Sequence, residues 1–157
     1  MIAKVFEELD QWIIEENKRI TDEGGMRIGD VYFKVVGQSA VLEANLSIDV
    51  DNTADVDAFS NLSHSVQTQF NELLKPLGKV YDAHSGEIWM PAETQYTPIF
   101  TGLYVKAELA GVEYVMVSKA LKAIDKNRVL LRSYIETDAS ELFSELAAKY
   151  GIILESI

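Results

Sequence analysis

A strongly apolar segment early in the chain is the most restrictive feature of this sequence. Residues Val31 to Val36 are β-branched or aromatic at five of six positions, which is typical of a largely buried strand. Gly37 follows at once, and amphipathic helical patterns lie on either side, over residues 3–20 and 61–75. This order predicts a mixed α+β fold in which helices pack against a sheet.

Further strands are expected after the first one. Residues 54–59 are predicted to form the next strand. Two hairpins then follow: one pairs residues 79–81 with 87–90, and the other pairs residues 103–109 with 112–117 through Ala110-Gly111. Residues 91–98 are typical of a loop. A short helix is expected near residues 40–45.

Helical patterns dominate the C-terminal part. Helices are predicted from Ser118 to about Ala123 and over about residues 127–135. Asp138 and Glu141 resemble a capping box at the start of the last helix, and Gly151 is well placed to end it. We therefore expect one domain, residues 1–157, with an N-terminal helix (3–20), a sheet core (about 31–117) and C-terminal helices (about 118–150).

Composition limits the classes of partner. The 157 residues include no cysteine, which excludes disulfides and thiolate metal ligands. The formal net charge of −11 repels phosphate backbones, so a nucleic-acid partner is unlikely unless a basic protein supplies the contact surface. The N-terminus has no secretory signal pattern, and no apolar stretch approaches the roughly 18 residues of a membrane span. We expect a cytoplasmic protein without a membrane partner.

Two acids in the second strand are the first candidate site. Asp55 and Asp57 are two residues apart, so their carboxylates should project from the same face of a strand. Two neighbouring carboxylates suit Mg²⁺ or Mn²⁺, which prefer oxygen ligands. The alternative is a solvated strand face, because such faces often carry two acids.

The turn after the first strand adds a second motif. Gly37-Gln38-Ser39 follows a buried strand and precedes a helix, so it exposes backbone N–H groups and a hydroxyl in a way that phosphates favour. Strand–glycine–helix turns are common. The combination with Asp-x-Asp on the next strand is the more informative signal.

That combination resembles the nucleotidyltransferase superfamily, and within it the compact bacterial group of toxin-type and uncharacterised minimal members. Two segments carry the likeness, Val35-Val36-Gly37-Gln38-Ser39-Ala40 and Thr53-Ala54-Asp55-Val56-Asp57, and Val115–Leu121 is similar to a third family segment. The resemblance spans about residues 28–150. It implies a nucleotidyltransferase-like mixed β-sheet flanked by helices, with a C-terminal helical part.

The resemblance also implies roles for individual residues. Gly37 and Ser39 would hold nucleotide phosphates, Lys119 would reach a phosphate, and Asp55 and Asp57 would bind the catalytic Mg²⁺ or Mn²⁺. Glu87 is the first candidate for the family's third carboxylate and metal ligand, and Glu108 is the second. Gln38 replaces the family's usual second glycine, and Asp125–Arg128 departs from its usual charged cluster.

The implied activity is metal-dependent transfer of a nucleoside monophosphate from a nucleoside triphosphate to a hydroxyl acceptor. One alternative is a catalytically degenerate binding or regulatory module, with a protein partner in a toxin–antitoxin or defence operon. Another is an unrelated α/β domain in which the motifs arose by chance.

Overall fold

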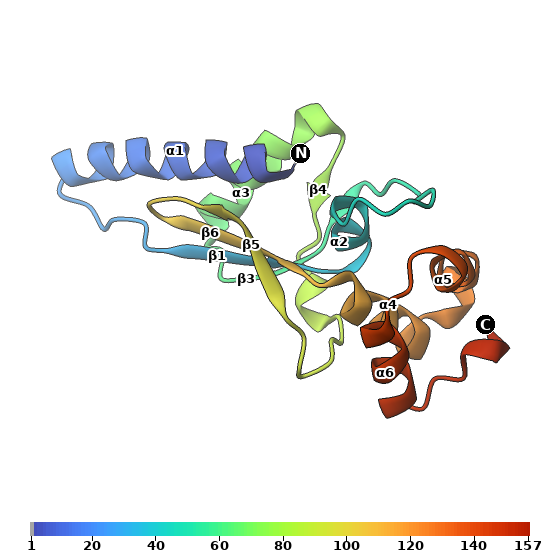
Figure 1. Ribbon diagram of the computed structural model, residues 1–157. Helices are drawn as coiled ribbons and strands as arrows, with labels where there is room; N and C mark the ends of the chain where they lie inside the picture. Colours follow the sequence, from blue (N-terminus) through green and yellow to red (C-terminus); the bar gives the residue numbers. More distant parts are fainter. Residues whose placement is uncertain (1) are drawn as a thin grey trace.

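The computed structural model describes residues 2–157 and has a mixed α+β fold (Figure 1). Its helices are α1 (Ile2–Asp22), α2 (Gly37–Glu43), α3 (His64–Leu74), α4 (Val112–Lys122), α5 (Ile124–Thr137) and α6 (Glu141–Lys149). Its strands are β1 (Val31–Val35), β2 (Asp55–Val56), β3 (Ala58–Ser60), β4 (Val80–Tyr81), β5 (Tyr96–Thr101) and β6 (Val105–Ala110). Short 3₁₀ turns are η1 (Lys75–Leu77), η2 (Ser85–Glu87) and η3 (Leu154–Ser156).

Four of the strands form one mixed sheet in the order β3-β1-β6-β5. The central pair, β1 and β6, is parallel, and the outer strands β3 and β5 run antiparallel to their neighbours. The two-residue strands β2 and β4 form a separate parallel pair. This small pair lies beside α2, and Asp57 and Asp82 directly follow its two strands.

Helices α1 and α3 cover one face of the main sheet (Figure 1). The alternation in β1 explains which face is covered, because Val31, Phe33 and Val35 are buried whereas Tyr32 is exposed. The Phe33 ring lies 4.7 Å from that of Phe6 on α1 and 4.8 Å from that of Phe70 on α3, between ring centroids. These aromatic contacts fix both helices against the sheet.

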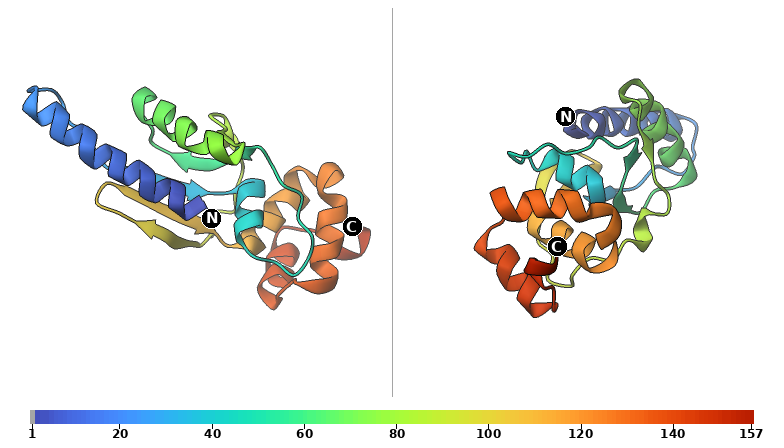
Figure 2. Two further views of the ribbon diagram at one scale, coloured as in Figure 1. Left: turned by 90° about the horizontal axis from the view of Figure 1, so that it is seen from above. Right: turned by 90° about the vertical axis from the view of Figure 1, so that its right-hand side faces the viewer.

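Helices α4, α5 and α6 form a second lobe at one end of the sheet, which gives the molecule an elongated shape (Figure 2). One continuous cluster of buried side chains runs through both lobes, from Phe6 and Leu9 to Leu131 and Phe143. Gly111 joins β6 directly to α4, and α4 packs against α2, α5 and α6. The helical lobe therefore faces the end of β1 and the turn that follows it.

A buried carboxylate ties the first helix to the β5–β6 hairpin. Asp10 accepts hydrogen bonds from the backbone N–H groups of Leu103, Tyr104 and Val105, at 3.2, 2.7 and 2.9 Å. The carboxylate lies so close to Gly102 that a Cβ atom there would overlap it. A charged acceptor thus satisfies three donors at the hairpin turn.

Several sequence predictions are confirmed with small shifts in their bounds. The helices expected over residues 3–20, 61–75 and 127–135 correspond to α1, α3 and α5, and the strand expected over residues 31–36 corresponds to β1. The strand expected over residues 54–59 is divided into β2 and β3. Ser140, rather than Asp138, caps α6 by accepting the Phe143 N–H at 3.2 Å.

Both predicted hairpins are wrong. Residues 80–81 pair with β2 in parallel, and residues 87–90 form no strand. Residues 112–117 begin α4, where five consecutive residues from Tyr114 to Ser118 are buried and leave no helical period to detect. Ser118 therefore lies inside this helix and does not begin one. Residues 96–98, expected in a loop, begin β5, which tolerates Pro98 because it is an edge strand.

No helix within residues 2–157 is both long and apolar enough to cross a bilayer.

Candidate functional site

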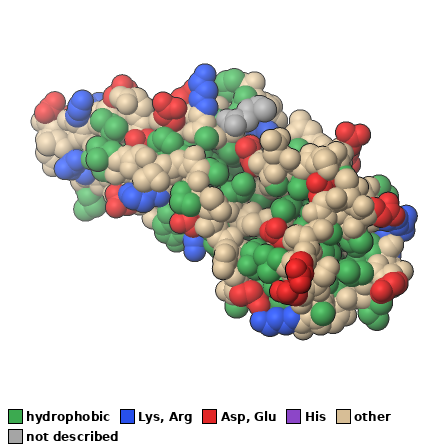
Figure 3. Space-filling model, in the orientation of Figure 1, with side chains coloured by type: hydrophobic (Ala, Val, Ile, Leu, Met, Phe, Trp, Pro, Cys, Tyr) green, Lys and Arg blue, Asp and Glu red, His purple; other side chains and the backbone are tan. Residues whose placement is uncertain are grey.

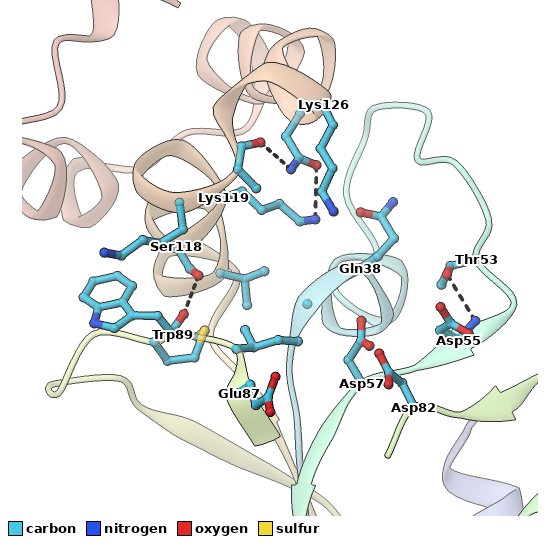
Figure 4. Close-up of a pocket in the computed structure, with 17 residues that line it drawn as sticks. Gln38, Thr53, Asp55, Asp57, Asp82, Glu87, Trp89, Ser118, Lys119 and Lys126 are labelled. Atoms are coloured by element: carbon cyan, nitrogen blue, oxygen red, sulfur yellow. Dashed lines mark hydrogen bonds between the residues drawn. The ribbon is translucent and has the colours of Figure 1, made fainter. Parts of the chain in front are cut away.

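A cavity of about 700 Å³ lies where the β2–β4 pair and the N-terminus of α2 face the helical lobe (Figure 4). Its lining includes five of the residues that the sequence analysis singled out, namely Gly37, Asp55, Asp57, Glu87 and Lys119. Acidic side chains form one wall and lysines from the helical lobe form another. An apolar segment closes the third side.

The acidic wall starts with the two aspartates around β2. Asp55 and Asp57 both line the cavity, whereas Val56 between them is 1 % exposed and points into the core. The alternation expected of a strand is thus present in this short segment. Thr53 holds its start, because its Oγ1 accepts the Asp55 N–H at 3.2 Å.

Asp82 is a third acid of this wall, which sequence reasoning missed. The parallel register pairs Asp55 with Val80 and Val56 with Tyr81, so Asp82 follows β4 at the level of Asp57. Figure 4 shows the Asp82 and Asp57 side chains next to each other. Residues 79–81 are correctly predicted as a strand, but the sequence analysis pairs them with residues 87–90 in an antiparallel hairpin. Parallel pairing with residues 55–56 would have placed Asp82 beside Asp57.

Glu87, the predicted third carboxylate, lies elsewhere. It belongs to η2 and lines the cavity, but Figure 4 places it between Trp89 and Asp57 and not beside the adjacent Asp57 and Asp82 side chains. The second candidate, Glu108, belongs to β6 and is not part of the cavity lining. The structure therefore brings Asp82, and neither glutamate, next to Asp57.

Gly37 allows the close approach of turn and aspartate. Its φ of +61° lies in the left-handed region, and a Cβ atom at this position would lie 2.5 Å from Asp57 Oδ2. The Asp57 carboxylate accepts a hydrogen bond from the Gln38 backbone N–H. The Gly37–Ser39 turn and the Asp-x-Asp segment are thus in direct contact.

Ser39 contacts the backbone of the aspartate segment from outside the cavity lining. Its Oγ donates to the Asp55 carbonyl at 3.0 Å and accepts the Asp57 N–H at 3.1 Å. The side chain is buried and does not line the cavity. Its hydroxyl therefore positions both aspartates, and the predicted contact between Ser39 and a phosphate stays a prediction.

Burial and neighbouring negative charge raise the pKa of Asp57. Burial is the largest cause, followed by the charges of Asp82 and Asp55, whereas Lys119 and the Gln38 N–H act in the opposite direction. The proton is therefore held more tightly here than on an isolated aspartate. A cation bound at this wall would remove the same repulsion.

The basic wall comes from α4 and the start of α5. Lys119, Lys122 and Lys126 all line the cavity, and Lys119 Nζ donates to Asn127 Oδ1 at 3.2 Å. Burial and the nearby Lys126 lower the pKa of Lys119, and Asp57 partly offsets this effect. The cluster contrasts with the face in Figure 3, where acidic side chains are scattered over both ends of the molecule.

Asp55, Asp57 and Asp82 contribute carboxylates to the cavity lining. Among residues 2–157, no group of three or more His, Cys, Asp or Glu side chains is arranged to hold a metal ion. Mg²⁺ commonly binds through one or two carboxylates together with substrate phosphates and water. The acidic wall fits that mode of binding.

Comparison of the chain with protein-family models, with curated proteins and with solved structures found no match.

Proposed function

We propose that this cavity binds a nucleoside triphosphate together with Mg²⁺ or Mn²⁺ and transfers its nucleoside monophosphate to a hydroxyl acceptor. The observation that carries the proposal is the opposition of two walls across one cavity, with Asp55 and Asp57 on one side and Lys119 on the other. A metal–triphosphate complex has matching charges, because the cation suits the carboxylates and the phosphate oxygens suit the lysines. The motif resemblance described above agrees with this placement.

The carboxylates would hold the metal ion through oxygen atoms, and the triphosphate would supply further ligands. Asp57 would have the closer contact with the turn, since it touches Gly37 and accepts the Gln38 N–H. Lys119, which is partly buried, would place a compact positive charge beside the phosphates.

In the proposed reaction the acceptor oxygen attacks the α-phosphorus. The new P–O bond forms as the bond to the β-phosphate oxygen breaks, and pyrophosphate leaves with the electron pair of that bond. The proton of the hydroxyl passes to a carboxylate.

Thermal unfolding in the presence of ligand tests the binding step. ATP, GTP, CTP and UTP are each titrated with Mg²⁺ or Mn²⁺. Ligand at about 100 times its Kd stabilises by about 2.7 kcal/mol, which is about 5–10 °C in Tm for a chain of this size. The Asp55→Asn/Asp57→Asn variant should lose this shift.

The matched control is Glu7→Gln/Glu8→Gln, which removes the same charge from exposed positions of α1 outside the cavity lining. The control should retain the full shift. Absence of any shift with all four nucleotides contradicts the proposal, and a shift that survives the aspartate substitutions contradicts the metal roles. Binding without pyrophosphate release would favour the binding-module alternative.

A further inference from the structure

The third side of the cavity differs in character from the two charged walls. It is formed by Ile88, Trp89 and Met90, and Val115 of α4 also lines the cavity. In Figure 4 Trp89 lies on the side opposite the aspartates, and Lys119 and Lys126 lie at the top of the cavity. The cavity thus has an acidic end and a largely apolar, aromatic end, where Lys122 lies over the indole, and Glu87 lies between the two ends.

We infer that Trp89 is the platform on which the base of the bound nucleotide stacks, and this inference rests on the proposed function. A nucleoside triphosphate has the same division as the cavity, with a charged triphosphate at one end and a planar base at the other. Tryptophan presents the largest aromatic face of any side chain, and bases of every kind stack on aromatic rings. The aspartates and lysines recognise the phosphates, which leaves the base to the apolar end.

Contacts hold Trp89 at its backbone and at its ring, although its segment has no regular secondary structure. Ser118 Oγ on α4 donates a hydrogen bond to the Trp89 carbonyl. The Tyr150 ring meets the indole edge-on, with 5.6 Å between the ring centroids. Glu93 in turn accepts hydrogen bonds from Tyr150 and Lys149. A platform that is already immobilised loses little conformational entropy when a ligand binds.

Lys122 is the present neighbour of the indole face, with its Nζ 5.4 Å from the ring centroid. A cation–π contact at an exposed site favours the contact state only about 2- to 5-fold. Stacking of one base contributes about 5- to 150-fold to affinity. A base therefore displaces the Lys122 ammonium group, which is exposed and mounted on a flexible stem.

The two tryptophans allow a direct optical test. Trp12 lies on α1 outside the cavity lining, so Trp12→Phe leaves Trp89 as the single indole reporter. Stacking of a base should quench Trp89 fluorescence on addition of Mg²⁺–ATP. Inorganic tripolyphosphate with Mg²⁺, which has no base, should bind without comparable quenching. Purine nucleotides should bind more tightly than pyrimidine nucleotides, since larger bases stack more strongly.

The affinities of variants distinguish the contribution of the base to binding from that of the phosphates. Trp89→Leu should weaken Mg²⁺–ATP binding at least 5-fold and leave tripolyphosphate binding unchanged, which also shows that the variant is folded. Trp89→Phe should retain most of the ATP affinity, because it keeps an aromatic face. Equal affinities of the unsubstituted protein for ATP and tripolyphosphate overturn the stacking inference alone. So does a Trp89→Leu variant whose ATP affinity is unchanged, or one that loses both ligands equally. Failure of the unsubstituted protein to bind either ligand overturns the proposed function as well.

Discussion

Replacement of Gly37 by alanine tests whether the contact between the turn and Asp57 organises the site. Two costs are expected. A non-glycine residue at φ +61° costs about 1–2 kcal/mol. The new Cβ atom would lie 2.5 Å from Asp57 Oδ2, whereas such atoms essentially never approach closer than 3.0 Å. The carboxylate must therefore move away from the Gln38 N–H.

Loss of that charge-assisted hydrogen bond adds about 1.5–3 kcal/mol. Gly37→Ala should therefore lower the free energy of unfolding by about 2.5–5 kcal/mol, measured by urea unfolding. Gly78→Ala is the matched control, because Gly78 has φ +69° and no atom within 4 Å of an added Cβ. The control should lose only the conformational cost of about 1–2 kcal/mol.

A double-mutant cycle identifies the cause of the difference. In an Asp57→Ala background the overlapping carboxylate is absent and only the Cβ of residue 57 remains, 3.2 Å from the added Cβ, so most of the excess cost of Gly37→Ala over Gly78→Ala should disappear. Between the two single variants, the difference in Tm should be about 3–12 °C, from about 2–4 °C per kcal/mol. Equal destabilisation by Gly37→Ala and Gly78→Ala would refute the reasoning.

Two further substitutions test the electrostatics of the site and the anchor of the first helix. The folded protein raises the pKa of Asp57 above its ordinary 3.8, so the carboxyl group binds its proton more tightly in the folded than in the unfolded state. The free energy of unfolding therefore falls as pH rises from about 4 through the raised pKa. Asp57→Asn should remove that part of the decline, so its stability relative to the unsubstituted protein should increase over this window in urea melts from pH 4 to 8; a constant difference would contradict the assignment. Asp10→Ala leaves the three N–H groups of the β5–β6 turn without their acceptor and should cost about 2–4 kcal/mol, whereas Asp22→Ala, at the exposed end of the same helix, should cost less than about 0.5 kcal/mol. Equal effects of these two substitutions would show that the turn finds other acceptors.

The local sequence pattern was sufficient to predict helices and strands that have one buried face and one solvent-exposed face. Helix α1 places Val5, Leu9 and Ile13 on one side and glutamates on the other, so its period is visible in the sequence. Strand β1 is equally clear from its β-branched and aromatic composition. Asp55 and Asp57 could be assigned to one face because a spacing of two residues is sufficient for that conclusion.

The pairing of strands that are distant in the sequence could not be predicted in the same way. Whether β4 pairs with the chain that follows it or with β2, 25 residues earlier at Asp55 and Val80, depends on the packing of α3 between them. The sequence favoured the local hairpin, and Asp82 was therefore missed as part of the acidic wall. The prediction of helix α4 failed for another reason: the helix is buried on nearly all sides, so its apolar residues follow one another without a helical period.

The anchor between Asp10 and the β5–β6 turn has a consequence for synthesis of the chain. The partners are 93 to 95 residues apart, so α1 leaves the ribosome about 5–20 s before the donors that fix it, at about 5–20 residues per second. Throughout that interval the apolar side of α1, including Phe6 and Leu9, has no completed sheet to cover it. Helix α1 is thus made well before the contacts that anchor it, and its apolar side stays uncovered while the sheet is still being synthesised.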